Sequence, residues 1–410
     1  MEERIMMKYI RFGIVAALAF VLAGCVGKDM FDASPEAIVM TGTDNSPLIK
    51  FAVEEAPSAY PVTVSATGEV TEDITVSIAV DNSLVEKYNE AHKTSYYALP
   101  ESAISLEKSS VVIKAGSAAS ETSLLSVVST DDFVDGRIYV IPVTITGVKG
   151  GNLDVLETSR TAYIRISRVY YFPALDLSNT NLYANYIFPD DKAMELPTHT
   201  VEVKFYANSW HSSTSEPISR MLGIYDKNEA GYLYRIGENG LDKNQLQVNK
   251  SNAAAFNSAT RFSENTWYTL TVTYDGSATR LYVDGVRDSE MSNGGPLTFQ
   301  RIELGMSWGG YRTKQYFDGR IAEIRIWDRV LSASEIQLGL CGVDPKSEGL
   351  RAYWKFNEGE GHIFHDATGN GYDIDWSKVC RDANEDGPLE DYDYSAEVNW
   401  LDDDKNRCAN

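Results

Sequence analysis

The acidic segment near the C-terminus carries the clearest pattern of metal-binding side chains in the sequence. It reads Asp-Ala-Asn-Glu-Asp-Gly over residues 382–387, and Asp393 stands at the twelfth position of the same stretch. In a calcium loop, oxygen atoms at positions 1, 3, 5 and 12 converge on the ion, and a glycine at position 6 permits the sharp turn. The spacing therefore predicts a Ca²⁺ site, with the ligands Asp382, Asn384, Asp386 and Asp393.

Two features of this acidic segment leave a second interpretation open. An EF-hand loop ends on a bidentate Glu, whereas Asp393 resembles the Asp of dockerin-type loops, and helices that would flank the loop are not evident. The segment is also so rich in Asp and Glu that the pattern can arise by chance. An acidic surface loop without a metal is the alternative.

Aromatic side chains in loop-like segments are candidates for sugar contact. A flat ring stacks on the C–H groups of a pyranose, while polar neighbours bind its hydroxyls. Trp308 and Tyr311 lie in a glycine-containing segment, and Trp210 follows a predicted strand. We expect Trp308, Tyr311 and Trp210 to bind carbohydrate, the alternative for each being a ring packed onto the core. Tyr232 and Tyr234 alternate on a strand and share a face, which packing explains better than binding.

The first 24 residues have the three parts of a secretion signal. Basic residues precede an apolar stretch, residues 12–22, which is too short to span a bilayer, and small residues then lead to Cys25. Leu-Ala-Gly-Cys at 22–25 resembles the lipobox of bacterial lipoproteins. The resemblance implies that residues 1–24 are a signal peptide, that Cys25 carries a lipid, and that residues 25–36 form a tether. A buried apolar helix ending in Gly-Cys is the alternative.

Lys28-Asp29 resembles the surface-export tag of Bacteroides-type lipoproteins. This resemblance implies an outer-membrane protein that is lipid-anchored and exposed on the cell surface. Lys and Arg total 37 against 59 Asp and Glu, a net charge of −22. Such a chain repels phosphate backbones and anionic lipid, so we expect no nucleic-acid partner and membrane contact through the anchor alone.

Three further cysteines, Cys341, Cys380 and Cys408, would remain after removal of the signal peptide. An extracytoplasmic compartment permits disulfides. A Cys341–Cys408 bridge would fasten the C-terminus to the domain, and this is the pairing we expect. A Cys380–Cys408 bridge, which would close the acidic loop, is the alternative.

The N-terminal half, residues 37–168, is patterned mostly as strands. Apolar and polar residues alternate over residues 74–80, and a capping-box pattern at Ser83–Glu86 predicts one short helix. Residues 81–89, 99–101 and 111–116 resemble the N-terminal DUF1735 domain of Bacteroidetes surface lipoproteins. That resemblance covers roughly 37–148 and implies an immunoglobulin-like β-sandwich without activity of its own, placed beside glycan-handling modules.

The C-terminal half, residues 172–410, is patterned as a second all-β domain. Trp267–Tyr274 and Arg280–Val283 are predicted strands, and Asp-Gly pairs mark the turn between them and the turn that follows. A second capping box at Ser332–Glu335 predicts another short helix. This half resembles laminin-G-like, concanavalin A-like jelly rolls in the segments 265–270, 281–285, 317–327, 349–359 and 366–371. The resemblance implies a jelly-roll sandwich.

Related jelly rolls also include glycosidases, whose two carboxylates lie about 5–5.5 Å or 6.5–9.5 Å apart. The compact Glu-x-Asp-x-x-Glu motif of the family's glucanases is missing from the sequence. Glu358, Glu360 and Asp366 lie close together in a glycine-rich stretch, where turn geometry explains them better. His362 and His365 have no evident third ligand for zinc. We therefore expect a protein that is not an enzyme.

These patterns together predict an all-β protein, an N-terminal immunoglobulin-like β-sandwich followed by a concanavalin A-like (laminin-G-like) jelly-roll sandwich. The function expected is that of a non-catalytic cell-surface lipoprotein. It would capture a polysaccharide or oligosaccharide for a carbohydrate uptake system in the outer membrane. The alternatives are a glycoside hydrolase with an unrecognised carboxylate pair and a protein-binding surface adhesin.

Overall fold

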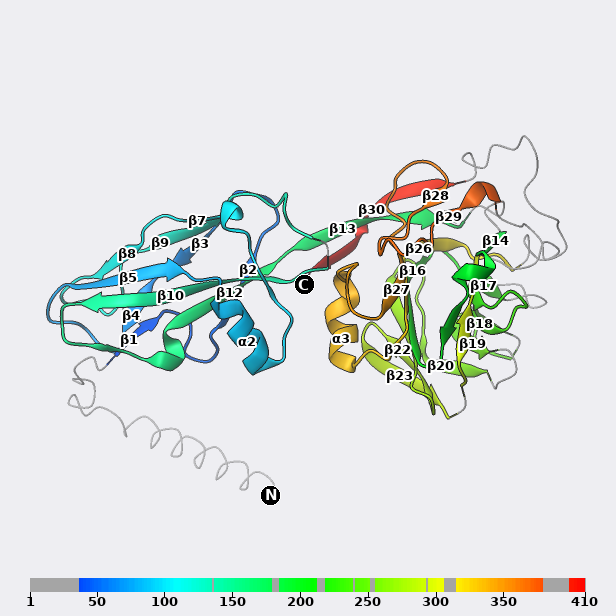
Figure 1. Cartoon of the computed structure of the whole chain (residues 1–410), viewed down its shortest axis with the longest axis horizontal. Helices are drawn as coiled ribbons and strands as arrows, with labels where there is room; N and C mark the ends of the chain where they lie inside the picture. Colours follow the sequence, from blue (N-terminus) through cyan, green and yellow to red (C-terminus); the bar gives the residue numbers. More distant parts are fainter. Residues whose placement is uncertain are drawn as a thin grey trace, which may run out of the picture. The chain divides into compact units, whose positions relative to one another are not determined.

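The computed structural model divides the chain into two compact units, each built almost wholly of β-strands (Figure 1). The residues that the structure describes are 37–134, 136–178, 184–211, 218–238, 240–250, 255–292, 294–305, 315–378 and 398–409. Unit 1 takes 37–51, 55–130 and 139–166 of these, and unit 2 takes 52–54, 131–138 and the rest from 167 onward. The predicted all-β fold class is confirmed.

Unit 1 contains three sheets, in the strand orders β11-β1-β4, β2-β12-β10-β5-β8 and β3-β9-β7, with β6 added to β10. The strands are β1 (Ala37–Met40), β2 (Leu48–Ala52), β3 (Ser58–Val62), β4 (Val64–Ala66), β5 (Ile74–Val80), β6 (Tyr97–Ala98), β7 (Ile104–Leu106), β8 (Ser110–Ile113), β9 (Ser123–Val127), β10 (Tyr139–Lys149), β11 (Asp154–Val155) and β12 (Thr161–Ser167). The alternation predicted over residues 74–80 is real, because Ile74, Val76 and Ile78 are buried while their neighbours are partly exposed.

One α-helix of unit 1, α2 (Leu84–His92), lies where the sequence predicts it, but its cap differs. Ser83 is the N-cap residue, and its side chain makes no capping hydrogen bond. Its hydroxyl donates instead to Asp81 Oδ1 at 2.6 Å. The capping box predicted at Ser83–Glu86 is therefore wrong, because a nearer carboxylate competes for the serine hydroxyl.

Unit 2 is a sandwich of two large sheets, with two small two-stranded sheets, β15-β24 and β28-β29, in addition. The eight-stranded sheet has the order β23-β22-β21-β16-β26-β13-β30, with β27 paired to β26, and the six-stranded sheet has the order β14-β25-β17-β18-β19-β20. The strands are β13 (Val169–Asp176), β14 (Ala184–Ile187), β15 (Met194–Leu196), β16 (His199–Ala207), β17 (Ser219–Tyr225), β18 (Gly231–Ile236), β19 (Gln245–Lys250), β20 (Phe256–Arg261), β21 (Trp267–Tyr274), β22 (Thr279–Val283), β23 (Val286–Met291), β24 (Leu297–Phe299), β25 (Arg301–Leu304), β26 (Gly319–Trp327), β27 (Leu350–Trp354), β28 (Ile363–Phe364), β29 (Ile374–Asp375) and β30 (Asn399–Ala409).

The core of unit 2 lies between its two large sheets. Val201, Val203 and Phe205 of β16 face it from one side, and Tyr232 and Tyr234 of β18 face it from the other. Both tyrosines have no exposed surface, so the expectation that they pack rather than bind is confirmed. Fully burying an apolar side chain such as Val201 or Phe205 stabilises the fold by about 1.5–3 kcal/mol.

The outer face of the eight-stranded sheet carries a smaller apolar cluster, formed by Trp327, Leu331, Ile336, Leu350 and Tyr353. Ile336 comes from α3 (Ala333–Leu338), which begins at Ser332 with the predicted capping box. The short helix η6 (Gly339–Cys341) follows α3 directly. Within the part of the chain that the structure describes, no helix is both long and apolar enough to span a membrane.

Candidate functional site

The outer face of the six-stranded sheet of unit 2, turned away from the core, carries polar and charged side chains. Strand register shows which residues share it, because residues paired across neighbouring strands lie on the same face. Tyr234 faces the core, so Arg235, the next residue, faces outward. Arg235 pairs with Arg220 of β17 on one side and with Gln247 of β19 on the other. Gln247 pairs in turn with Asn257 of β20.

Hydrogen bonds join three of these side chains into a row, Arg235–Gln247–Asn257. Arg235 donates through Nε and Nη2 to Gln247 Oε1 at 3.0 and 2.6 Å, and Gln247 Nε2 donates to Asn257 Oδ1 at 3.0 Å. Arg235 and Gln247 are partly exposed, and Asn257 is exposed. A row of guanidinium and amide groups on an accessible sheet face is suited to hydrogen bonding with hydroxyl groups of a ligand.

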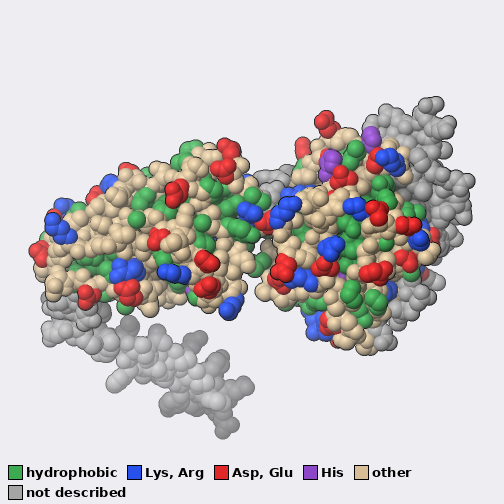
Figure 2. All heavy atoms as spheres, in the orientation of Figure 1, with side chains coloured by type: hydrophobic (Ala, Val, Ile, Leu, Met, Phe, Trp, Pro, Cys, Tyr) green, Lys and Arg blue, Asp and Glu red, His purple; other side chains and the backbone are tan. Residues whose placement is uncertain are grey.

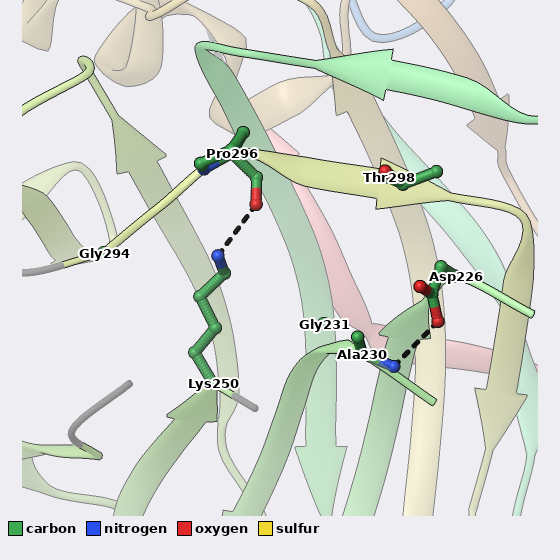
Figure 3. Close-up of a pocket in the computed structure, with 7 residues that line it drawn as sticks. All are labelled: Asp226, Ala230, Gly231, Lys250, Gly294, Pro296 and Thr298. Carbon is green, nitrogen blue, oxygen red and sulfur yellow. Dashed lines mark hydrogen bonds between the residues drawn. The ribbon is translucent and has the colours of Figure 1, made fainter. Parts of the chain in front are cut away.

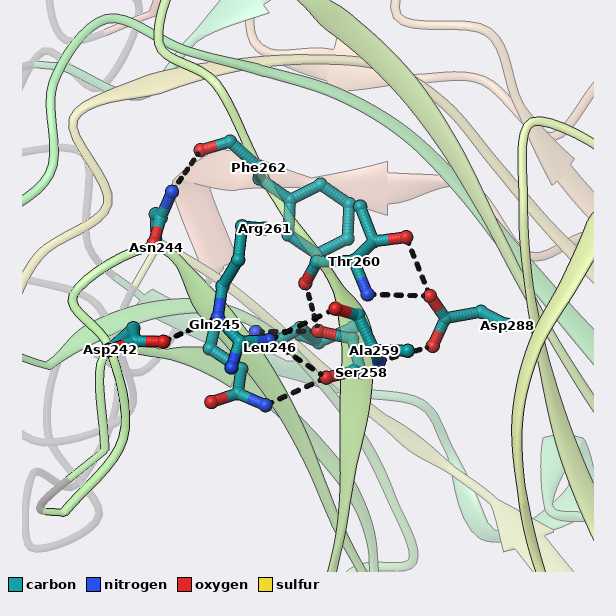
Figure 4. A network of polar contacts seen from close by, with 10 residues as sticks. All are labelled: Asp242, Asn244, Gln245, Leu246, Ser258, Ala259, Thr260, Arg261, Phe262 and Asp288. Atoms are coloured by element: carbon teal, nitrogen blue, oxygen red, sulfur yellow. Dashed lines mark hydrogen bonds and ion pairs between the residues drawn. The ribbon is translucent and has the colours of Figure 1, made fainter.

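Contacts between β19, β20 and the neighbouring β23 hold this row in place (Figure 4). Gln245 Nε2 donates to Ser258 O at 2.7 Å, and Arg261 Nε donates to Asp242 at 2.5 Å. Asp288 of β23, which belongs to the other large sheet, accepts from the backbone N–H groups of Ala259 and Thr260 at 2.8 Å each. The strands that carry Gln247 and Asn257 are thus fixed by polar contacts from both sheets.

The β25–β17 half of the same outer face is different, because its charged residues are buried. Arg301 is 4% exposed and Glu303 is 2% exposed, although both lie on the face away from the core. Arg301 donates to Glu303 Oε1 at 2.5 Å and to Glu229 Oε1 at 3.0 Å. Glu303 Oε2 and Arg301 Nε find no hydrogen-bond partner among the described residues. Buried polar atoms without partners indicate a place where water or a ligand group fits.

Burial sets the protonation of Glu303. It raises the pKa of this carboxyl to about 7, against the opposing effect of the Arg301 guanidinium. Tyr225, on the same face, also has a raised pKa, chiefly because of burial and secondly because of Glu303. Glu303 therefore changes charge near neutral pH, unlike an ordinary carboxyl group.

A glycine lets the ring of Tyr225 lie beside Glu303. A methyl group at Gly223 would lie 2.3 Å from Tyr225 Cε2 and 2.9 Å from Glu303 Oε2. Both distances are too short for real atoms, so a side chain at this position would displace the ring or the carboxyl. The missing side chain at 223 thus brings an aromatic ring, a carboxyl and a guanidinium together on one face.

The structure corrects one of the predicted sugar-binding residues. Trp210 is 5% exposed and packs in the core of unit 2, and its Nε1 donates to Phe262 O at 3.0 Å. The expectation that Trp210 binds carbohydrate is therefore wrong, because the ring and its N–H group are already used inside the fold. Trp308 and Tyr311 lie in the segment 306–314, outside the described residues.

The predicted metal ligands and the lipidation site also fall outside the described residues. Asp382, Asn384, Asp386 and Asp393 lie in the segment 379–397, and Cys25 lies within 1–36. Elsewhere, among the residues that are described, no group of three or more His, Cys, Asp or Glu side chains could hold a metal ion.

Cys341 is buried in η6, and this helix contacts β30, the strand that carries Cys408. The side chain of Cys408 is not among those described, so the Cys341–Cys408 pairing stays a prediction.

The glycine-rich stretch near β28 is a structural turn around Asp366. This carboxylate is 6% exposed, and it accepts hydrogen bonds from the backbone N–H groups of Tyr353, Thr368 and Asn370 at 3.1 Å each. Glu358 Oε1 accepts from the N–H group of His365 at 2.8 Å. The interpretation of these carboxyl groups as turn formers is confirmed for Asp366, whose oxygens are already occupied.

Sequence reasoning missed Arg220, Arg301 and Glu303. Alternation along β18 singled out Tyr232 and Tyr234, and it equally implies an outward Arg235, so this residue could have been found. The others depend on cross-strand register and on a bulge between Arg220 and Leu222, which turns Arg220 to the outer face.

Known families match both halves of the chain. A family model described as the concanavalin A-like lectin/glucanases superfamily matches residues 180–337, and a model of an N-terminal domain matches residues 34–152. No curated protein matches the chain.

Several solved structures are similar to this chain. A candidate carbohydrate-binding protein from Bacteroides ovatus ATCC 8483 is 22% identical with a TM-score of 0.59, covering 82% of this chain and 94% of its own. A heptameric SAP-like pentraxin from Limulus polyphemus is 10% identical with a TM-score of 0.35, covering 44% and 87%. A two-domain protein of unknown function from Bacteroides fragilis NCTC 9343 is 14% identical with a TM-score of 0.27, covering 72% and 96%. The chain thus consists of an all-β N-terminal unit followed by a β-sandwich unit, of which residues 180–337 match the concanavalin A-like superfamily model.

Proposed function

We propose that this protein is a non-catalytic carbohydrate-binding protein that uses the outer face of the six-stranded sheet of unit 2. The observation that carries the proposal is the accessible row Arg235–Gln247–Asn257, whose side chains are held in place by their own hydrogen bonds. Hydroxyl groups both donate and accept hydrogen bonds, so a sugar can pair with guanidinium and amide groups together. The similarity to a candidate carbohydrate-binding protein from Bacteroides ovatus supports the same function.

The wider role that we propose is capture of polysaccharide or oligosaccharide at the cell surface, on behalf of outer-membrane uptake proteins. The lipid on Cys25 would hold the protein at the outer membrane, and Trp308 and Tyr311 would stack on the sugar. Acidic and basic side chains are scattered over the face shown in Figure 2, which agrees with a partner that carries little charge. Protease accessibility on intact cells tests the location, and protection of the protein from protease would contradict surface capture.

A glycan array with residues 26–410 tests the binding function. We expect the wild-type protein to retain at least one polysaccharide, and Arg235→Ala to weaken that binding about tenfold or more, because one charged hydrogen bond is worth roughly 1.5–3 kcal/mol. Lys243→Ala is the matched control, since Lys243 is an exposed basic residue beside β19. Equal losses in both variants, or no glycan retained by the wild-type protein, would contradict the proposal. A protein partner recovered without any glycan binding would favour an adhesin.

Glycoside hydrolysis is the second candidate function, and Glu303 favours it. A carboxyl with a pKa of about 7 can donate a proton at neutral pH, as the general acid of a glycosidase must. A hydrolase would release products from the bound glycan, and Glu303→Gln would abolish the release while binding persists. Binding without release in the wild-type protein would exclude this candidate.

We also propose that Ca²⁺ binds through Asp382, Asn384, Asp386 and Asp393. Calcium should then raise the melting temperature of the protein, because a ligand that binds only the folded state stabilises it. Asp382→Ala and Asp386→Ala should remove the rise. A melting temperature that is the same with calcium and with a chelator would contradict this site.

A further inference from the structure

A cavity in unit 2 lies away from the outer-face row, at one end of the sandwich. Its volume is about 300 Å³, at the small end of the range for ligand pockets, and three parts of the chain line it (Figure 3). They are the turn between β17 and β18, the last residue of β19, and the stretch that leads into β24. The residues used below are Asp226, Ala230, Lys250 and Pro296.

Lys250 supplies a buried hydrogen-bond donor to this pocket. It pairs with the core-facing Tyr232, is 8% exposed, and lies with Nζ 5.7 Å from the centre of the Tyr232 ring. Its Nζ donates to Pro296 O at 2.8 Å, which uses one of three N–H groups. The other two have no hydrogen-bond partner among the described residues. Burial lowers the pKa of Lys250.

Asp226 supplies an acceptor from a different side of the pocket. Its Oδ1 accepts from the backbone N–H groups of Asn228 and Ala230, both at 2.8 Å, so the turn fixes the direction of the carboxylate. Its Oδ2 accepts no hydrogen bond from the described residues. Figure 3 shows Asp226 and Lys250 approaching the pocket from opposite sides.

The two groups together select the chemistry of a ligand. One cation and one anion leave the pocket with no net charge, so an anionic group gains little there. A hydroxyl group can accept from Lys250 and donate to Asp226, and a pyranose carries several hydroxyl groups on one small ring. The volume suits one such ring rather than a chain of them.

We propose that this pocket is a second carbohydrate site, which takes a single neutral pyranose unit. Lys250 donates to one of its hydroxyl groups, and Asp226 accepts from another. The choice of a sugar rests on the proposed function of the chain, but the site uses none of the residues of the outer-face row.

Titration calorimetry of the full chain with single sugars tests the pocket. The probes are glucose, galactose, mannose and N-acetylglucosamine, with glucuronate and sulfate as anionic counterparts. We expect at least one neutral sugar to bind with a Kd on the order of 1 mM, the affinity that a ligand of about twelve non-hydrogen atoms reaches. Tighter binding of glucuronate or sulfate than of every neutral sugar would overturn the proposal, as would no binding of any neutral sugar.

Three variants locate the bound sugar. Lys250→Met removes the donor and Asp226→Asn turns an acceptor into a donor, so each should weaken binding about tenfold. Ala230→Trp fills the pocket without changing a charge, so it keeps the test decisive if Lys250→Met fails to fold. Lys243→Met is the control that should change nothing. Unchanged sugar binding in Ala230→Trp would overturn the pocket.

Arg235→Ala separates the two proposals. It should weaken polysaccharide binding at the outer face and leave the single-sugar titration unchanged. If Ala230→Trp removes single-sugar binding and the wild-type protein binds no polysaccharide, the proposed site on the outer face is refuted and the proposed pocket site is supported. Polysaccharide binding that depends on Arg235, with no single sugar bound, would refute the pocket alone.

Discussion

The two large sheets of unit 2 both bury an arginine and carboxylates on their outer faces. The two networks differ in how many of the carboxylate oxygens accept a hydrogen bond. On the eight-stranded sheet, Arg325 donates to Glu202 at 3.2 Å and to Glu323 at 2.6 Å. The indole of Trp327 donates to the same Glu202 oxygen at 2.9 Å, and the Tyr353 hydroxyl donates to Glu323 at 3.0 Å. With Thr271 on Glu202 Oε1, every oxygen of both carboxylates has a donor.

The chain itself also covers this first network. A methyl group at Gly339 of η6 would lie 3.2 Å from Arg325 Nη1, so η6 lies directly on the guanidinium. The arginine Nε lacks a partner among the described residues in both networks, but on the six-stranded sheet the carboxylate oxygen Glu303 Oε2 also lacks one. Pairing of all four carboxylate oxygens marks the first network as structural, since buried carboxylates without partners are costly. The second network differs in leaving one buried carboxylate oxygen, Glu303 Oε2, without a partner among the described residues.

Removing the arginine from each network tests this comparison most directly. Arg325→Met should lower the free energy of unfolding by about 3–5 kcal/mol, because it leaves two buried carboxylates without their cation. Arg301→Met should cost only about 1–2 kcal/mol at pH 6, because Glu303 can bind a proton there. Denaturant titrations of both variants give the two values. Equal costs would show that the second network is as structural as the first.

The pH dependence of stability sharpens the same contrast. The pKa of Glu303 lies at about 7 in the folded protein against an ordinary value of 4.5, so the folded state binds more protons between these values. Stability therefore falls as the pH rises through this window. Glu303→Gln should gain stability relative to the wild-type protein between pH 4.5 and 8, by at most about 3 kcal/mol. A difference in stability between Glu303→Gln and the wild-type protein that does not change with pH would contradict the raised pKa of Glu303.

The smallest change in stability is expected for a substitution at the N-cap of α3, the helix that precedes η6 over the network around Arg325. Ser332→Ala removes the capping box of α3, which packs Ile336 against Trp327 and Tyr353, and it should cost about 1 kcal/mol. Ser83→Ala is the matched control, because Ser83 makes no capping hydrogen bond at α2. Thermal melts of the two variants measure the difference. A larger loss in Ser83→Ala than in Ser332→Ala would contradict the observed caps.

Local pattern predicts the strands of this protein well. β21 has the predicted bounds, Trp267–Tyr274, because alternation of apolar and polar residues is a property of the segment itself. The two predicted serine caps show that local pattern alone is not sufficient. Ser83 donates to the carboxylate of Asp81, whereas Ser332 caps its helix.

The candidate site could not be predicted in the same way. A loop-like sequence around Trp210 does not reveal whether its ring turns into the core or away from it. The neighbours of Glu303 come from strands far apart in sequence, and a one-residue bulge decides the face on which Arg220 lies. Sequence patterns of one strand contain neither fact.

The contact between Asp288 and β20 has a consequence for how the molecule behaves in concentrated solution. β20 is the last strand of the six-stranded sheet, and an open edge invites pairing with a strand from another molecule. Asp288 occupies the N–H groups of Ala259 and Thr260 and places a carboxylate beside them. A strand approaching this edge would meet fewer free donors and a negative charge, so the sheet is protected against edge-to-edge aggregation.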